Sequence, residues 1–336
     1  MGPFSLIYNT ILSGRKFIIR HLKKPVRLPV RVISIGNLTL GGTGKTPAVI
    51  AVSREAKMRG LQPIILTRGY KGSAKGPCFV SKGEGLVLSV IEAGDEPYMM
   101  AERLKGTPIV LGKDRHRSGL FALEDLLSGN KSDQSEIIFI LDDGFQHIAL
   151  HRDTDVLLID SSKPFWREKL FPEGRLREPA REILRADIIV LTKADIVSSD
   201  SISECIENVK MHNPKALIYR ASHKPVSLVK MSGEEEALEG LKESKAYIFS
   251  GIANPSYFKA LLTSNGAEII NFMEFNDHHV YTQSDIDKIN LAASGLRKIT
   301  TEKDMVKLRQ LKSTDDISAL KIEFSVEEEF YDKLFQ

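Results

Sequence analysis

The stretch ISIGNLTLGGTGKT, residues 33–46, determines how the rest of the chain is interpreted. It starts as an apolar strand, continues as a glycine-rich loop and ends at Lys45 and Thr46, where a helical pattern begins. Glycines allow backbone N–H groups to curl around a phosphate, and a helix N-terminus adds partial positive charge. Lys45 can then reach the β- and γ-phosphates of a nucleotide, while Thr46 can offer its hydroxyl to Mg²⁺. The stretch therefore predicts a nucleotide-binding loop.

The loop departs from the strict pattern GxxxxGK[ST] at Thr39, which stands in place of the first glycine. Leu40 occupies the position at which certain dimeric ATPases carry an extra lysine, so the sequence argues against that class. The predicted nucleotide-binding residues are Thr39, Leu40, Gly41, Gly42, Thr43, Gly44, Lys45 and Thr46.

The apolar pattern around the loop predicts an α/β fold. Short apolar runs alternate with helical stretches, and most runs are continuous, as expected for parallel strands covered on both faces. The predicted strands of this first region are 30–36, 63–67, 107–111, 137–141, 155–160 and 187–193. This pattern is typical of a P-loop NTPase-like, doubly wound and mainly parallel sheet.

A second αβ pattern follows, and a change of character over residues 216–229 places a domain boundary near residue 220. Its predicted elements are strands at 246–251, 267–275 and 319–324 and helices near 255–264 and 283–296. We therefore expect three units, namely an N-terminal amphipathic helix within 1–29, a P-loop core over 30–219 and a smaller α/β domain over 220–336.

Composition is ordinary for a globular protein. The 336 residues are 42% hydrophobic and 27% charged, which excludes a disordered tail, a collagen-like fibre and a small disulfide scaffold. Two distant cysteines, Cys78 and Cys205, form no CxxC pair and no Cys/His cluster. The chain is therefore expected to be reduced and to lack structural zinc.

Charge is segregated along the chain. Residues 1–54 hold nine of the 47 Lys and Arg residues and no acid, so the remainder carries 38 bases against 44 acids. Within this front end, residues 4–22 place Phe, Leu and Ile at helical spacing among basic residues. Such a helix suits the plane of an anionic membrane, although a core-packed helix with a basic outer face fits equally well. The apolar runs are too short to span a bilayer, and no arginine–aromatic module indicates nucleic-acid binding.

Two adjacent carboxylates, Asp142 and Asp143, follow the apolar run 137–141. Ligands of open α/β sheets bind at the carboxyl ends of the parallel strands, so these two acids are the predicted Mg²⁺ ligands, directly or through water. The sequence GDEP adds Asp95 and Glu96 before a helix, where simple helix capping is the competing explanation.

Other polar clusters lie at predicted strand ends or in loops. Arg115 and Arg177 are candidates for binding phosphate, because the planar guanidinium fork matches phosphate oxygens. FNDHHVY groups Asp277, His278 and His279, and an Asp–His pair can orient an imidazole or share a proton at neutral pH. A metal site there is not expected, because adjacent histidines point to different sides. The element LTKAD, 191–195, is similar to the guanine-reading [NT]KxD motif and leaves a soluble regulatory GTPase as the alternative.

Taken together, the motifs resemble one family closely, the tetraacyldisaccharide 4'-kinases of lipid A biosynthesis in Gram-negative bacteria. The matching elements run in order across the chain: ISIGNLTLGGTGKTP, TRGYKG, GDEP, the DR of GKDRHR, LDDGFQH, GRLREP, LTKAD, GIANPSYF, FNDHHVY and TTEKDMVKL. The resemblance implies an α/β P-loop kinase whose active site lies in the cleft between two domains. It implies transfer of the γ-phosphate of Mg-ATP to the 4'-hydroxyl of a tetraacyldisaccharide 1-phosphate, which yields lipid IV-A.

The resemblance also implies roles for individual residues. Asp95 is expected to be the catalytic base and His278, beside Asp277, its partner from the second domain. Glu96 is expected near Mg²⁺ with Thr46 and the Asp142–Asp143 pair, and Arg115 and Arg177 near phosphate charge. Which of His278 and His279 meets Asp95 stays open, as does which carboxylate of the Asp142–Asp143 pair binds the metal directly. LTKAD is then expected to be a structural strand end.

The resemblance finally implies a place in the cell. It predicts a peripheral protein at the cytoplasmic face of the bacterial inner membrane, anchored by the helix within 4–22, with a lipid substrate and no obligate protein partner. Seven bases up to Arg31 are expected to face anionic headgroups. They are Arg15, Lys16, Arg20, Lys23, Lys24, Arg27 and Arg31.

Overall fold

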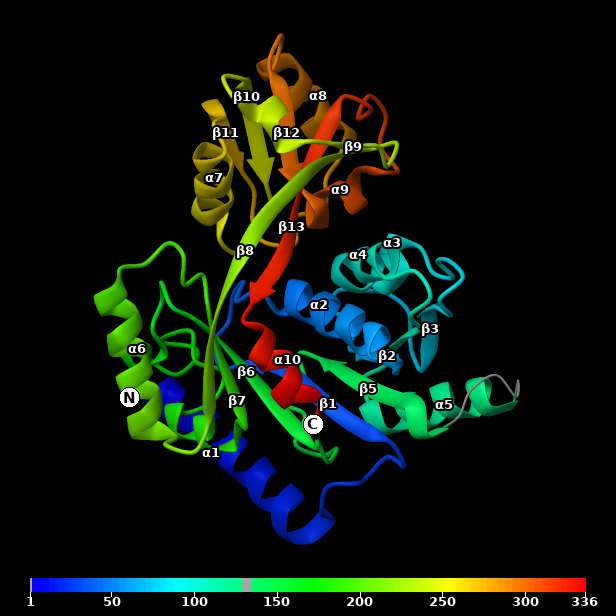
Figure 1. The fold of residues 1–336 in the computed structure, drawn as a ribbon, viewed down its shortest axis with the longest axis vertical. Coiled ribbons are helices and arrows are strands. Elements are labelled where there is room, and N and C mark those ends of the chain that lie inside the picture. Colours follow the sequence, from blue (N-terminus) through cyan, green and yellow to red (C-terminus); the bar gives the residue numbers. More distant parts are fainter. Residues whose placement is uncertain (1, 129–133) are drawn as a thin grey trace.

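The strand that leads into the glycine-rich loop lies at the centre of a parallel sheet in the computed structural model, which describes residues 2–128 and 134–336 (Figure 1). In this half of the molecule the strand order is β7-β6-β1-β5-β2-β4-β3, and only β3 is antiparallel to its neighbour. The strands are β1 (Arg31–Asn37), β2 (Gln62–Thr67), β3 (Cys78–Ser81), β4 (Ile109–Leu111), β5 (Ile137–Asp142), β6 (Thr154–Asp160) and β7 (Ile188–Thr192).

The six predicted strands of this region are confirmed to within two residues. Their continuous apolar runs have a simple cause, because both faces of the sheet are covered. Along β1, Ile33 and Ile35 pack toward helix α2, while Val32 packs on the opposite face toward α5. The helices of this domain are α2 (Lys45–Met58), α3 (Val90–Ala93), α4 (Asp95–Arg103), α5 (Arg115–Ser128) and α6 (Ser199–His212).

A single long strand, β8 (Leu217–Lys230), connects the two halves of the molecule (Figure 1). Its first residues, 217–220, pair in parallel with β7, and residues 221–230 pair antiparallel with β13. The change of character over 216–229 is therefore a strand that leaves one sheet for the next. The proposed boundary near residue 220 falls within this shared strand.

The second domain repeats the layered arrangement on a smaller scale. Its strand order is β11-β10-β12-β13-β8, with Ile248 of β10 facing α7 and Tyr247 and Phe249 facing α8 and α9. The elements are β9 (Glu235–Glu236), β10 (Lys245–Ser250), α7 (Pro255–Ser264), β11 (Glu268–Glu274), α8 (Gln283–Ala292), β12 (Arg297–Thr301), α9 (Glu302–Leu308) and β13 (Ile317–Val326). The α/β, mainly parallel, doubly wound fold class is thus confirmed.

The last helix, α10 (Glu328–Phe335), returns to the first domain and packs beside α2 (Figure 1). Phe330 and Leu334 are fully buried in the same apolar cluster as Ile33 and Ile35. Arg31 donates a hydrogen bond of 2.7 Å to the carbonyl of Leu334. Residues at the end of the chain therefore complete the core of the P-loop domain.

The first helix, α1 (Pro3–Phe17), is followed by a π-helical segment, Ile18–Lys23, and presents its apolar side outward. Phe4, Ile7 and Ile11 are 68%, 59% and 66% exposed. The side that contacts the domain is polar, because the Ser5 hydroxyl donates to the carbonyl of Leu170 at 2.7 Å. No helix in the described part of the chain is both long and apolar enough to cross a membrane.

Two of the bases predicted to face headgroups are engaged inside the protein instead. Lys16 is buried and forms ion pairs of 2.9 Å with both Glu178 and Glu182, and Arg31 is bonded to α10. Glu178 and Glu182, which also pair with Arg185, face the polar inner side of α1, and Lys16 adds a second cation to them there. Arg15, Lys24 and Arg27 are exposed, whereas the side chains of Arg20 and Lys23 lie outside the described residues.

Candidate active site

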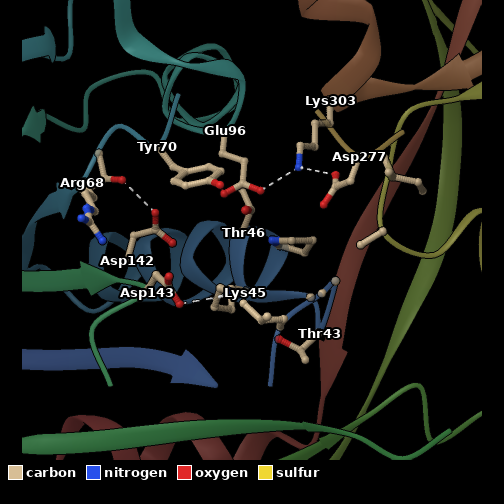
Figure 2. A pocket seen from close by; sticks show the side chains of 18 of the residues that line it. Thr43, Lys45, Thr46, Arg68, Tyr70, Glu96, Asp142, Asp143, Asp277 and Lys303 are labelled. Carbon is tan, nitrogen blue, oxygen red and sulfur yellow. Dashed lines mark hydrogen bonds and ion pairs between the residues drawn. The ribbon is translucent and has the colours of Figure 1, made fainter. Parts of the chain in front are cut away.

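A cavity of about 840 Å³ lies between the two domains, bordered by the glycine-rich loop. The first domain contributes the loop, Glu96 and the Asp142–Asp143 pair, and the second contributes residues 252–254, Asp277, His278 and Lys303. Figure 2 shows these side chains converging from both domains. The predicted site residues that border the cavity are Leu40, Gly41, Gly42, Thr43, Gly44, Lys45, Thr46, Glu96, Arg115, Asp142, Asp143, Arg177, Asp277 and His278.

The glycine-rich loop is held open by contacts at both of its ends. Asn37, the last residue of β1, donates from its amide to Thr43 Oγ1 at 2.9 Å, and Gly44 takes φ +84° directly before α2 begins. Thr39 does not border the cavity, because it is buried in a β-bridge with Leu176. The residue at the position of the first glycine thus lies outside the cavity, in an antiparallel bridge to the segment that carries Arg177.

The two carboxylates after β5 differ in their partners. Asp143 receives two hydrogen bonds from Arg177, of 2.9 and 2.7 Å, and lies 3.6 Å from Lys45 Nζ. Asp142 accepts a hydrogen bond from Thr67 at 2.8 Å, and its other oxygen is buried without a partner in the described part of the chain.

The different surroundings move the pKa values of the two carboxylates in opposite directions. Burial, with the nearby charges of Glu96 and Asp143, raises the pKa of Asp142 to about 6. Burial would also raise the pKa of Asp143, but Lys45 and Arg177 outweigh it and lower that pKa to about 2. Asp142 is therefore the carboxylate with a free oxygen, and Asp143 the one already neutralised by cations.

Arg115 is buried and is not an exposed arginine of a surface loop. Its side chain donates to the carbonyl of Gly112 at 2.8 Å and reaches the carbonyl of Asp142 at 3.4 Å. Burial lowers its pKa to about 10, although Asp142 and Asp143 oppose this shift. Arg115 thus borders the cavity while supporting the strand end that carries both acids.

The Asp–His pair forms across the two domains, between residues 183 positions apart. Asp95 is the first residue of α4, and its Oδ2 lies 2.8 Å from His278 Nδ1. His278 has φ +59°, an uncommon conformation for a non-glycine residue. Its backbone N–H donates a hydrogen bond to the carbonyl of Gly251. His279 turns away to Asp285 at 3.1 Å and stacks on Phe275. The open question between the two histidines is answered in favour of His278.

Asp95 is itself buried behind His278, whose ring borders the cavity. Burial alone would raise the pKa of Asp95, but the hydrogen bond with His278 and the charge of Lys303 outweigh it and hold the pKa below its ordinary value. In this conformation, therefore, Asp95 is an ionised carboxylate that is covered by an imidazole.

Lys303, on α9, is a site residue that the sequence analysis did not single out. Its Nζ lies 2.9 Å from Glu96 and 3.4 Å from Asp277 (Figure 2). It also lies 3.3 Å from His278 Nε2. Burial alone would lower the pKa of Lys303. The charges of Glu96, Asp95 and Asp277 outweigh burial and raise that pKa, so the ammonium stays charged. No spacing in the sequence marks this lysine, and only its membership of the TTEKDMVKL element could have indicated it.

An ionic contact holds α4 against the second domain. Arg103 at the end of α4 bonds to Glu302 at 2.8 Å and to Glu323 at 2.7 Å. Arg54 of α2 bonds to the same Glu323 at 2.6 Å. The helix that carries Asp95 is therefore fixed to the domain that carries His278 at a second point.

A magnesium ion fits the donor set at the end of β5. Among the described residues, no group of three or more His, Cys, Asp or Glu side chains is arranged to hold a metal. Mg²⁺ at nucleotide sites usually takes only one or two protein ligands and completes its shell with water and phosphate oxygens. The unpartnered buried oxygen of Asp142 and the hydroxyl of Thr46, which both face the cavity, suit that role.

The LTKAD element has a structural environment. Lys193 is buried, ion-paired with Asp160 and placed over the ring of Tyr257. Asp195, which would read a guanine edge, is exposed to solvent and does not border the cavity. The guanine-reading alternative therefore lacks the arrangement it needs.

Helix α1 reaches the site through the segment after residue 170. Its Tyr8 hydroxyl donates to the carbonyl of Arg177 at 3.0 Å, and Lys16 pairs with the adjacent Glu178. Tyr8, Leu12 and Arg15 also border the cavity. The cavity thus extends from the glycine-rich loop to the inner edge of the helix whose outer side is apolar.

Known proteins match this chain over nearly its whole length. The family model for tetraacyldisaccharide-1-P 4'-kinase (LpxK) matches residues 1–336. A tetraacyldisaccharide 4'-kinase of Halothermothrix orenii is 38% identical over 327 residues, covering 93% of this chain and 82% of that protein. The tetraacyldisaccharide 4'-kinase of Aquifex aeolicus is 36% identical over 328 residues, covering 97% and 94%. A crystal structure of the "apo" form of LpxK from Aquifex aeolicus in complex with ATP is similar with a TM-score of 0.77 at 32% identity, covering 99% and 96% of the two chains.

Proposed function

The chain belongs to the tetraacyldisaccharide 4'-kinase family, and from that premise we propose how its own residues carry out the reaction. The enzyme is a phosphotransferase that moves the γ-phosphate of ATP to the 4'-hydroxyl of a tetraacyldisaccharide 1-phosphate, a step of lipid A biosynthesis. Family membership favours this activity over a regulatory GTPase.

Residues 41–46 hold the nucleotide in this proposal. Their backbone N–H groups face the phosphates, and the ammonium of Lys45 reaches the β- and γ-phosphates. Arg177 keeps Asp143 ionised and in place, and Asp143 in turn lies within 3.6 Å of Lys45. This set, Lys45, Asp142, Asp143 and Arg177, is called the phosphate cluster below.

Thr46 and Asp142 would hold Mg²⁺, and Glu96, whose charge acts on Asp142, is a further carboxylate at the same cavity. When bound, the ion would offset the negative charge that develops on the phosphates during transfer. Glu96 is paired with Lys303 at 2.9 Å in this conformation, so its approach to the ion requires that pair to loosen.

The Asp95–His278 pair takes the proton of the 4'-hydroxyl. Because the ring of His278 covers Asp95 in this conformation, Asp95 accepts the proton only after that imidazole has shifted, and the imidazole then takes the proton on, since a carboxylate alone is a weak base. Lys303 and Asp277 flank His278 and set the charge around it. These five residues, Asp95, Glu96, Asp277, His278 and Lys303, are called the dyad cluster below.

The observation that carries the proposal is the 2.8 Å contact between Asp95 and His278 beside the nucleotide loop. A phosphate-transfer assay with Mg-ATP and a 1-phosphorylated tetraacyl disaccharide tests it. We expect a 4'-phosphorylated product, with little ATP hydrolysis when the lipid is omitted. The absence of product from a folded, ATP-binding enzyme would contradict the proposed function.

We also propose that α1 places the enzyme on an anionic membrane surface, at the cytoplasmic face of the inner membrane. The helix contacts the domain through Ser5, Tyr8 and Lys16, which leaves the apolar stripe outward. The exposed apolar residues are Phe4, Leu6, Ile7, Ile11, Phe17, Ile18 and Leu22. An outward apolar stripe with exposed bases beside it is the composition of an interfacial helix.

Co-sedimentation with anionic vesicles tests the membrane proposal without removing the helix. The variant Ile7→Ser, Ile11→Ser, Ile18→Ser should lose vesicle binding and keep its ATP affinity. Met211→Ser with Leu291→Ser, which replaces exposed apolar residues elsewhere (71% and 82%), is the matched control and should still bind. Equal binding by both variants would exclude α1 as the anchor.

A further inference from the structure

His223 is a buried histidine that the proposed mechanism leaves without a role. It lies on β8, only a few residues after the strand leaves β7 and joins β13 opposite Phe324. Its side chain is 3% exposed and borders the cavity together with the nucleotide loop. The strand shared by the two domains therefore points an imidazole at the nucleotide site.

The ring lies directly against the loop. A Cβ built on Gly44 would stand 2.3 Å from His223 Nε2, so the nitrogen is in contact with the backbone that precedes Lys45. The other ring neighbours are the aromatic side chains of Tyr257 and Phe324, at centroid distances of 5.7 and 6.1 Å. Neither contact gives a ring nitrogen of His223 a hydrogen-bond partner of nitrogen or oxygen.

Neither nitrogen of His223 has a hydrogen-bond partner among residues 2–128 and 134–336. Burial, reinforced by the charge of Lys193, lowers its pKa to about 4, so the ring is neutral and carries one N–H. Buried polar groups in folded proteins are nearly always satisfied, and a buried imidazole with two unmet nitrogens is an exception that needs a cause. A ligand in the cavity supplies the missing partner.

We propose that His223 is a nucleotide-binding residue whose ring N–H donates a hydrogen bond to a phosphate oxygen of the nucleotide held by the glycine-rich loop. The partner is a phosphate because the imidazole contacts Gly44, and the loop residues around Gly44 are those that cradle phosphates. The inference rests on the proposed nucleotide site and adds to it a residue that belongs to the interdomain strand.

Binding titrations in the presence of Mg²⁺ test the inference, with ATP, inorganic tripolyphosphate and adenosine as probes. His223→Phe fills the space without a donor and should weaken ATP and tripolyphosphate by about tenfold or more, while adenosine is unaffected. His223→Gln retains an N–H near the Nε2 position and should recover part of the loss. His212→Phe, which removes a histidine from α6, is the control and should leave all affinities unchanged.

A measurement on the unmodified protein covers the case in which the Phe variant folds poorly. In ¹⁵N-histidine-labelled enzyme, the His223 ring signal, identified by its absence from His223→Gln, should show a protected, downfield N–H after tripolyphosphate is added. An unchanged signal, or wild-type affinity for tripolyphosphate in a folded His223→Phe, would overturn the inference. So would a loss confined to adenosine. If the wild-type enzyme itself failed to bind ATP, the proposed nucleotide site would fail instead.

Discussion

The phosphate cluster and the dyad cluster are built in different ways. Lys45, Asp142, Asp143 and Arg177 all belong to the first domain, and the Asp143–Arg177 pair already exists without a ligand. The dyad cluster takes Asp95 and Glu96 from the first domain and Asp277, His278 and Lys303 from the second. The phosphate cluster thus lies within one domain, whereas the dyad cluster takes residues from both.

This difference separates the residues that depend on contact between the domains from those that do not. Any opening between the domains would part Asp95 from His278 and Glu96 from Lys303, whereas the Asp143–Arg177 pair would stay intact. Substitutions in the two clusters should therefore have separable effects.

The largest expected effect is in the dyad cluster. Asp95→Asn should lower kcat by about 10³-fold, because general base catalysis contributes 10²–10⁴-fold, and should leave the Kd for ATP unchanged. Steady-state kinetics and calorimetric ATP titration measure the two quantities. Asp195→Asn, at an exposed carboxylate outside the cavity, is the control. A matching loss of ATP affinity in Asp95→Asn would show that the two clusters are not separable.

A substitution in the phosphate cluster should instead weaken the binding of ATP. Lys45→Met should weaken ATP by about 100-fold, since it removes a charge-assisted contact to phosphate and leaves Asp143 with Arg177 alone. Lys57→Met, at the far end of α2, is the matched control and should bind ATP normally. Normal ATP affinity in Lys45→Met would contradict the assignment of the loop.

A third prediction separates Asp142 from Asp143 through pH. The folded-state pKa of Asp142, about 6, lies above the ordinary aspartate value of 3.8, so the folded protein holds that proton more tightly. Asp142 therefore destabilises the ligand-free fold as pH rises from about 4 to about 6, by on the order of 2–3 kcal/mol above that range. Asp142→Asn should be more stable than the wild type at pH 7.5, and the gain should vanish near pH 4.

Asp143 serves as the control, because its ionised form should stabilise the fold, whereas ionised Asp142 should destabilise it. The folded-state pKa of Asp143, about 2, lies below the ordinary aspartate value of 3.8, so its ionised form stabilises the fold above pH 4 and that contribution is lost as pH falls toward 2. Asp143→Asn should therefore lower the stability at pH 7.5. Urea unfolding of the ligand-free proteins at several pH values measures both effects. If the two substitutions changed the free energy of unfolding at pH 7.5 in the same direction, the assigned difference between Asp142 and Asp143 would be refuted.

The smallest effect is expected where α4 is fixed to the second domain. Arg103→Gln removes contacts to Glu302 and Glu323, partly buried acids that would be left without this cation. We expect a loss of stability of about 1–3 kcal/mol and a lower kcat, with ATP affinity unchanged. Lys82→Gln, which breaks an exposed ion pair with Asp125, should change neither the stability nor kcat. A loss of ATP affinity in Arg103→Gln would mean that domain contact also shapes the phosphate cluster.

The sequence predicted the first sheet well for a physical reason. Strands such as β5 and β6 are buried on both faces, so their apolar runs are continuous and bounded by polar residues. β3 was missed because Cys78–Ser81 is a short antiparallel edge strand. β8 was not recognised as one strand because its alternation of buried and exposed residues, regular through Tyr219, Ala221 and His223, breaks near Pro225, where its pairing with β13 is irregular.

The site was predictable only where local pattern fixes local structure. The glycine-rich loop and the Asp142–Asp143 pair follow directly from strand–loop–helix order, and the family resemblance supplied the partnership of Asp95 with the DHH element. The choice of His278 depends on φ +59° at that residue, which no composition reveals. Lys303 and His223 become site residues through domain docking and strand crossing. Lys16 was assigned to the wrong side of α1 because the acids it meets, Glu178 and Glu182, are more than 160 positions away.

The return of α10 to the first domain has a consequence for how the protein is made. The apolar face of α2 and β1 is covered by Phe330 and Leu334, and Arg31 is bonded to a carbonyl 303 residues later. On the ribosome, the nucleotide domain therefore cannot complete its core until synthesis has passed residue 334. Until then that apolar face is open to chaperones, to proteases and to other nascent chains. A substitution such as Phe330→Asp should accordingly reduce the yield of folded enzyme in cells, although Phe330 lies far from the nucleotide loop in the sequence.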